Sequence, residues 1–193
     1  ALAKKENPKL KLMIGGEGEE KDKLIELSKA LGLSDSVSFL GWVSDVPRFF
    51  AACDIDVLCS ISESFPYSVL EGIREGCAVI TSDVGGMNKL IQHGVSGYIF
   101  QPRDVETFAK YIIDLSLDKV KRKAFAKRLY ETASSTYSLD GMARTQNEIY
   151  QNILAREERR RTHKRDGVLI CGAYGRGNAG DEAILKAILM AMR

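Results

Sequence analysis

The sequence predicts an α/β fold, a doubly wound parallel sheet with helices on both faces. Short apolar segments alternate with longer amphipathic segments along most of the chain. This alternation is typical of parallel strands joined by crossover helices. The composition agrees, because 193 residues, 45% hydrophobic and 28% charged, suffice for one globular domain or slightly more. No apolar run is long enough to cross a membrane.

The expected strands are short and rich in Val, Ile and Leu. The first alternates polar and apolar residues, which indicates a strand with one buried face. The later ones are more continuously apolar, as expected for strands inside a parallel sheet. The expected strands are residues 9–14, 37–40, 55–59, 78–81 and 98–100.

The expected helices follow these strands and carry apolar residues at helical spacing. Gly32 should end the first helix, and the side chains of Ser44 and Asp104 should cap the starts of two others. Pro47 and Pro66 have a fixed φ and no N–H, so each fits at or just before a first helical turn. The expected helices are residues 19–31, 46–53, a segment starting near Pro66, 88–91, 105–115, 120–134 and 141–156.

Two glutamates, Glu63 and Glu71, flank the start of the helix after the strand at 55–59. Ligands of α/β units bind beyond the carboxyl ends of strands, so the loops after 55–59 and 78–81 should share one crevice. A helix N-terminus favours phosphate. Glu71, one turn into the helix, is placed to accept both hydroxyls of a ribose, and Glu63 to accept sugar hydroxyls. On spacing alone, however, two such glutamates are more often solvated surface residues.

The stretch Ser60–Gly86, SISESFPYSVLEGIREGCAVITSDVGG, resembles the E-x7-E signature of retaining GT-B glycosyltransferases of family 4. The likeness continues outward and covers roughly residues 8–152. One departure is Lys89, where the family often carries a glutamate after GG-x-x. The other matching segments are Gly15–Gly18, Val37–Trp42, Asp54–Ser60, Leu90–Tyr98 and Pro102–Asp104.

The resemblance implies the C-terminal, Rossmann-like half of a GT-B enzyme, with the first strand of that half missing. It implies that Glu63 is the catalytic residue that orients the donor sugar, that Glu71 binds the ribose, and that Trp42 or Val43 approaches the base. A purely structural role for Trp42 remains the alternative. No metal and no cofactor are expected, and helix N-termini and basic side chains would hold the diphosphate. The implied donor-binding residues are Gly16, Trp42, Val43, Glu63, Ser64, Phe65, Pro66, Tyr67, Ser68 and Glu71.

The function implied by this resemblance is transfer of a sugar, with retention, from a nucleotide sugar such as a UDP- or GDP-sugar. The acceptor would be a glycan or a lipid-linked molecule in bacterial surface polysaccharide biosynthesis. Two alternatives remain: a non-catalytic nucleotide or sugar-phosphate-binding domain, and a GT-B-related nucleotide-sugar epimerase. Product analysis separates the three. We also expect the chain by itself to be inactive, because the family's acceptor-binding domain and the G-R…K phosphate-binding residues of the missing strand lie outside it.

The end of the chain differs in charge from the rest. Residues 156–165 hold six arginines and lysines against two glutamates, a net charge of +4, whereas the whole chain carries +2 and the remainder therefore −2. We expect residues 1–153 to form the nucleotide-sugar-binding domain, 154–166 a basic linker, and 167–193 the start of a second domain. The basic charge suits peripheral contact with an anionic membrane surface. Because no aromatic residues interleave the basic ones, nucleic acid is not an expected partner.

The predicted second domain opens with an apolar strand, a glycine-rich loop and an apolar helix. Such a loop fits an anion. The run GAYGRGNAGDEAIL resembles the opening of polysaccharide pyruvyl transferases, which transfer a pyruvyl group from phosphoenolpyruvate to a sugar. The resemblance implies a second enzyme, truncated here, and a generic first turn of a nucleotide-binding fold remains an alternative. The implied phosphate-loop residues are Gly175, Gly177, Asn178, Gly180 and Asp181.

The four cysteines, Cys53, Cys59, Cys77 and Cys171, lie singly in apolar surroundings. No C-x-x-C pair and no Cys/His cluster occurs in the sequence, so a zinc site is not expected. Buried, reduced thiols are typical of a cytoplasmic protein. The expected location is therefore the cytoplasm, with the inner face of the cell membrane as the place of any surface contact.

Overall fold

The computed structural model describes residues 1–162, so the predicted second domain and its phosphate-loop residues lie outside the described part. The chain divides into two compact units, Ala1–Ala143 and Arg144–Arg193. The first unit contains the described strands and the whole predicted donor site. The second is described only along one helix, which ends at Thr162.

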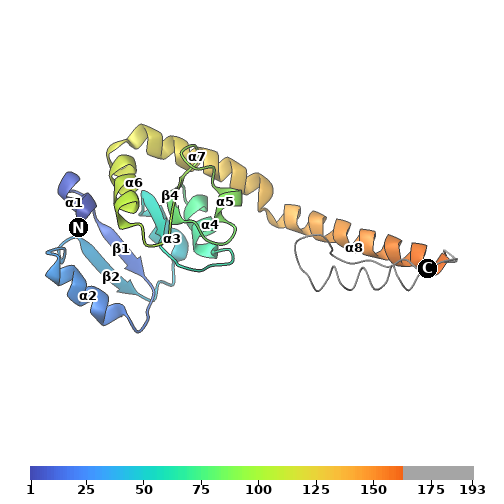
Figure 1. The fold of residues 1–193 in the computed structure, drawn as a ribbon, viewed down its shortest axis with the longest axis horizontal. Helices are drawn as coiled ribbons and strands as arrows, with labels where there is room; N and C mark the ends of the chain where they lie inside the picture. Colours follow the sequence, from blue (N-terminus) through green and yellow to red (C-terminus); the bar gives the residue numbers. More distant parts are fainter. Residues whose placement is uncertain (163–193) are drawn as a thin grey trace, which may run out of the picture. The chain divides into compact units, whose positions relative to one another are not determined.

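Strands and helices alternate through the first unit, as predicted (Figure 1). The strands are β1 (Leu12–Gly15), β2 (Val37–Gly41), β3 (Ile55–Leu58), β4 (Ala78–Ser82) and β5 (Tyr98–Phe100). The helices are α1 (Leu2–Glu6), α2 (Lys21–Ala30), α3 (Val46–Ala51), α4 (Tyr67–Arg74), α5 (Met87–Leu90), α6 (Val105–Leu117), α7 (Lys119–Thr136) and α8 (Leu139–Thr162).

The strands form two ladders in which every pairing is parallel. β1 pairs with β2, and β4 lies between β3 and β5. Within the described residues β1 and β3 do not pair with each other, so each strand keeps one open edge. Parallel ladders whose strands are joined by helices are the pattern of a doubly wound α/β fold.

Strand β4 is the centre of the core, because all five of its residues are buried. Successive side chains of a strand point to opposite faces. Val79 packs in a cluster with residues of α4, α5 and α7, whereas Ala78 and Ile80 pack in another with residues of β5, α6 and α7. Helices therefore cover both faces of the sheet around β4, as predicted for a doubly wound fold (Figure 1).

Three helices, α3, α6 and α7, begin at an aspartate that accepts a hydrogen bond from the first turn. Asp104 accepts from the Thr107 N–H at 3.0 Å, as predicted for α6. The cap of α3 is Asp45, which accepts from the Arg48 N–H at 3.0 Å, so the prediction of Ser44 as the cap is wrong. Both residue types are good caps, and the position of the first helical turn decides between them.

The turn between β4 and α5 lies against the loop that precedes α4. The Gly86 N–H donates to the Ser64 carbonyl at 3.0 Å. Gly85 has a φ of +55°, and a Cβ there would lie 2.2 Å from the same carbonyl oxygen. A Cβ on Gly86 would lie 2.8 Å from the Phe65 ring. Glycine is therefore required at both positions by the close approach of two loops.

Asp56 places a carboxylate inside the contact between β3 and α4. Among the described residues, its Oδ2 is buried without a hydrogen-bond partner, and it lies 2.6 Å from where a Cβ on Gly72 would stand. Burial raises the pKa of Asp56 to about 6; a backbone hydrogen bond at Val57 opposes this shift, and the charge of Glu71 adds to it. Ionised Asp56 therefore destabilises the fold at neutral pH.

Replacing Gly85 by alanine tests the close approach of the two loops. An alanine at positive φ lowers the free energy of unfolding by about 1–2 kcal/mol by itself. The clash with the Ser64 carbonyl should lower it by about 1–3 kcal/mol more. Gly94→Ala is the matched control, because Gly94 has a φ of +73° and no atom outside its immediate neighbours lies within 4 Å of where its Cβ would stand. Urea unfolding should show the larger loss for Gly85→Ala, and equal losses would contradict the close approach.

Replacing Asp56 by asparagine tests the buried carboxylate. The folded-state pKa of about 6 exceeds the ordinary 3.8, so the folded protein holds the proton more tightly and loses stability as pH rises between these values. The loss amounts to roughly 2–3 kcal/mol at about 1.4 kcal/mol per pKa unit. Urea unfolding from pH 4 to 8 should show this decline in the wild type and its absence in Asp56→Asn. The exposed Asp35→Asn variant should keep the wild-type decline; parallel profiles for all three proteins would show that Asp56 does not titrate this way.

Candidate functional site

Glu63 is held in the loop between β3 and α4 by two serines. The Ser60 hydroxyl donates to Glu63 Oε1 at 2.9 Å. The Ser60 carbonyl accepts from the Ser82 hydroxyl at 2.6 Å, and Ser82 is the buried last residue of β4. The carboxylate of Glu63 itself remains exposed. Its position is therefore set from the core while its oxygens face solvent.

The helix that follows begins directly after this loop. Pro66 is the N-cap residue of α4 and is buried, with φ −74° and ψ 117°. Tyr67 and Ser68 form the start of the helix and are exposed, and Glu71 lies one turn further, also exposed. The positive end of the α4 dipole thus lies beside the loop that carries Glu63, which suits an anionic group of a ligand.

A second corner forms where β1 and β2 end. The Gly16 N–H donates to the Gly41 carbonyl at 2.7 Å, and Gly16 has a φ of +111°. The Val43 side chain packs near Gly15, 3.0 Å from where a Cβ would stand. The Trp42 side chain is 82% exposed, so it is not a core residue. Its free indole face is available to stack on a planar ligand group.

The predicted donor residues therefore fall into two groups. The first group consists of Glu63, Ser64, Phe65 and the start of α4, and it lies against the β4–α5 turn. The second group consists of Gly16, Trp42 and Val43. Each group lies at the carboxyl ends of strands, as predicted. The sequence alone did not indicate that Ser60 and Ser82 hold Glu63 and its loop. Serines at strand ends next to a loop glutamate are the pattern from which this role could have been predicted.

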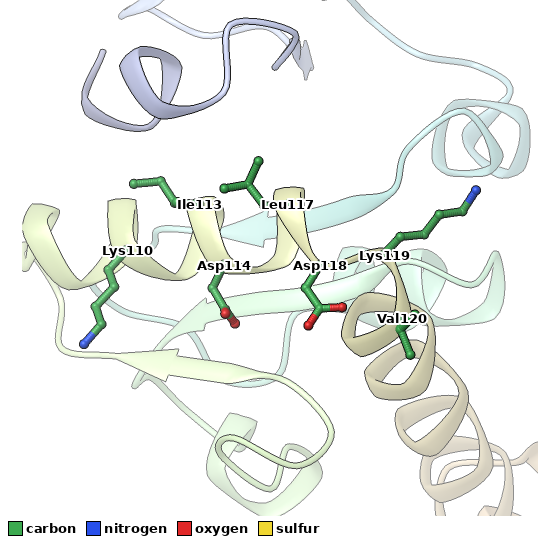
Figure 2. Close-up of a pocket in the computed structure, with 7 residues that line it drawn as sticks. All are labelled: Lys110, Ile113, Asp114, Leu117, Asp118, Lys119 and Val120. Atoms are coloured by element: carbon green, nitrogen blue, oxygen red, sulfur yellow. The ribbon is translucent and has the colours of Figure 1, made fainter.

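Two hollows of the first unit lie away from these residues. One, of about 650 Å³, is on α6 and the start of α7, where Figure 2 shows Asp114 and Asp118 pointing away from Ile113 and Leu117. Its carboxylates are already used: Asp114 binds the Lys121 ammonium and the Tyr98 hydroxyl, and Asp118 caps α7. The other, of about 520 Å³, lies between α5 and α7 and includes Lys89. Neither is lined by a predicted donor residue.

The described cysteines are not suited to nucleophilic chemistry. Burial raises the pKa of Cys77 to about 12 and also raises the pKa of the Cys53 and Cys59 thiols, which leaves little reactive thiolate at neutral pH. Between residues 1 and 162, no three His, Cys, Asp or Glu side chains gather in a way that could hold a metal ion. No helix in the same range has the length and apolar character needed to span a bilayer.

Comparison with known proteins gives close relatives over most of the chain. Lipopolysaccharide core biosynthesis glycosyltransferase LpsE of Rhizobium meliloti is 31% identical over 148 residues, which are 77% of this chain and 42% of that protein. N-acetyl-alpha-D-glucosaminyl L-malate synthase of Bacillus anthracis is 31% identical over 144 residues, 75% of this chain and 38% of that protein. The chain therefore spans less than half the length of these relatives.

Solved structures share the fold. Alr3699/HepE of Anabaena, crystallised in complex with UDP, matches with a TM-score of 0.69 and 27% identity over 75% of this chain and 42% of that chain. The C-terminal domain of the glycosyl transferase group 1 protein LpcC of Francisella tularensis matches with a TM-score of 0.66 and 26% identity, over 72% of this chain and 75% of that one. The family model "Glycosyl transferases group 1" matches residues 1–132, more than half of the chain. The chain therefore belongs to the group 1 glycosyl transferases.

Proposed function

We propose that this chain binds the donor in a retaining glycosyltransferase that moves a sugar from a nucleotide sugar to a glycan or lipid-linked acceptor. The biological setting we propose is bacterial surface polysaccharide biosynthesis, in the cytoplasm. Family membership supports the class of reaction. The relative named for lipopolysaccharide core biosynthesis and the HepE complexes with UDP and UDP-glucose support the setting and the kind of donor.

The observation that carries this proposal is the placement of Glu63 and Glu71 around the N-terminus of α4. Glu63, oriented by Ser60, accepts hydrogen bonds from hydroxyls of the donor sugar. Glu71 accepts from the two hydroxyls of the ribose. The N–H groups at the start of α4 lie between them, where a diphosphate would join ribose and sugar. Trp42 and Val43 approach the nucleotide base from the other corner.

In the proposed reaction, the bond between the anomeric carbon and the diphosphate oxygen breaks, and a bond from the same carbon to an acceptor oxygen forms. The nucleoside diphosphate leaves, and the proton of the acceptor hydroxyl is released with it. Groups that stabilise the charge developing on the diphosphate lower the barrier most. In this proposal the N–H groups at the start of α4 supply that stabilisation, and no metal is invoked. Neither glutamate is assigned as a nucleophile.

The C-terminal region carries two further proposals. The α8 arginines 156 and 159–161 are exposed and would favour contact with an anionic membrane surface. Residues 167–193, outside the described part, would begin a polysaccharide pyruvyl transferase that uses phosphoenolpyruvate, through Gly175, Gly177, Asn178, Gly180 and Asp181. The reading frame of the source gene tests this fusion, and a stop codon soon after Arg193 would reject it.

Replacing Glu71 by alanine tests the ribose contact. A hydrogen bond to a charged group contributes about 1.5–3 kcal/mol, so UDP should bind roughly tenfold to a hundredfold more weakly. Isothermal titration of the chain with UDP and GDP measures this loss. Glu26→Ala, an exposed glutamate on α2, is the control and should bind like the wild type. If Glu71→Ala keeps its affinity for every nucleotide that the wild type binds, the ribose role is wrong.

Replacing Glu63 by glutamine separates sugar binding from nucleotide binding. Because Glu63 contacts the sugar and not the nucleotide in this proposal, the variant should bind UDP like the wild type but UDP-glucose about tenfold more weakly. Ser60→Ala should show a smaller loss of the same kind, since the Ser60 hydroxyl only orients the carboxylate. A parallel loss for UDP and UDP-glucose would contradict this division of roles.

A further inference from the structure

We propose that Tyr137 is a positioning residue for the loop that carries Glu63, an inference that rests on the proposed function of that loop. The Tyr137 ring stacks on the Phe65 ring, with centroids 5.0 Å apart and an angle of 28° between the planes. Phe65 lies two residues after Glu63, whereas Tyr137 lies in the short connection between α7 and α8. The stack therefore joins the site loop to a distant part of the chain.

Phe65 is the side chain through which the loop is attached to the core. It is half-buried and packs against the cluster that contains Val69 and Leu129. Its ring also fills the space beside Gly86, where a Cβ would lie 2.8 Å away. The hydrogen bonds of the loop to Ser82 and Gly86 hold its backbone from the β4 side. The Phe65 ring needs a second surface to fix its orientation, and Tyr137 provides it.

Tyr137 is itself held firmly by the two helices that it connects. Its N–H donates to the Ala133 carbonyl at 2.8 Å, which ends α7, and Ala133 is buried in the same core cluster as Leu129. The next residue, Ser138, accepts from the Gly141 N–H at 3.0 Å and so starts α8. The Tyr137 side chain remains 38% exposed, so its ring covers Phe65 rather than filling the core.

Loss of the Phe65–Tyr137 stack should affect Glu63 but not Glu71. Glu71 belongs to α4, which packs on the core through Val69 and Ile73 independently of Tyr137. Glu63 belongs to the loop, so its position depends on the orientation of Phe65. Loss of the stack should therefore weaken recognition of the donor sugar and leave recognition of the nucleotide unchanged. Tyr137 acts through Phe65 and does not touch the substrate.

The test compares four proteins, each the full 193-residue chain: the wild type, Tyr137→Ala, Tyr137→Phe and the control Tyr130→Ala. Tyr130 is on α7 and is 47% exposed, which makes it a matched tyrosine outside the stack. Hydrogen exchange of the amides in residues 59–65 should be about three- to tenfold faster in Tyr137→Ala, as expected for loss of one aromatic pair. Tyr137→Phe keeps the ring and should exchange like the wild type, as should Tyr130→Ala.

Ligand binding is measured on the same proteins. The ratio of UDP-glucose affinity to UDP affinity should fall about three- to tenfold in Tyr137→Ala and return in Tyr137→Phe. Tyr137→Leu, which keeps apolar contact without a ring, replaces Tyr137→Ala if the latter does not fold. Unchanged loop exchange in the ring-deleted variant, or no rescue by Tyr137→Phe, overturns the inference. If the wild type binds no nucleotide, the proposed function fails while the exchange data still decide whether Tyr137 positions the loop.

Discussion

The complete burial of β4 is the constraint on which the rest of the first unit depends. Its side chains alternate between two separate hydrophobic clusters, one on each face, so helices must pack on both faces of the sheet. At and just after its carboxyl end, Ser82, Gly85 and Gly86 contact the loop before α4. The strand that anchors the core thus also sets the backbone of the site, and a shift of β4 would move both.

The exposed carboxylate of Glu63 illustrates how a surface group acquires a defined position. A solvated side chain loses rotamer freedom only when its neighbours are fixed. Here Ser60 contacts the carboxylate directly, Ser82 and Gly86 hydrogen-bond to the loop backbone, and Tyr137 stacks on Phe65 of the same loop. Each of these interactions is modest, and together they connect the loop to three different parts of the first unit.

Next to this well-supported loop, the structure places a destabilising feature. The buried Asp56 carboxylate lies under α4, and its charge and that of Glu71 repel each other. A fold selected for stability alone would favour an apolar side chain at this position. The contact between Asp56 and Gly72 shows that α4 lies close to β3, and no side chain larger than that of glycine fits at position 72. Stability and site geometry therefore compete within one helix–strand contact.

The sequence by itself determined the order of strands and helices, the parallel α/β class and the position of Glu63 and Glu71 on either side of Pro66. These features are local, because apolar periodicity and helix-start residues are encoded within a few neighbouring positions. Only the tertiary structure decided that Asp45 and not Ser44 caps α3, that Trp42 is exposed, and that Phe65 meets Tyr137. Such features depend on how distant segments approach one another, and no local pattern of residues specifies that approach.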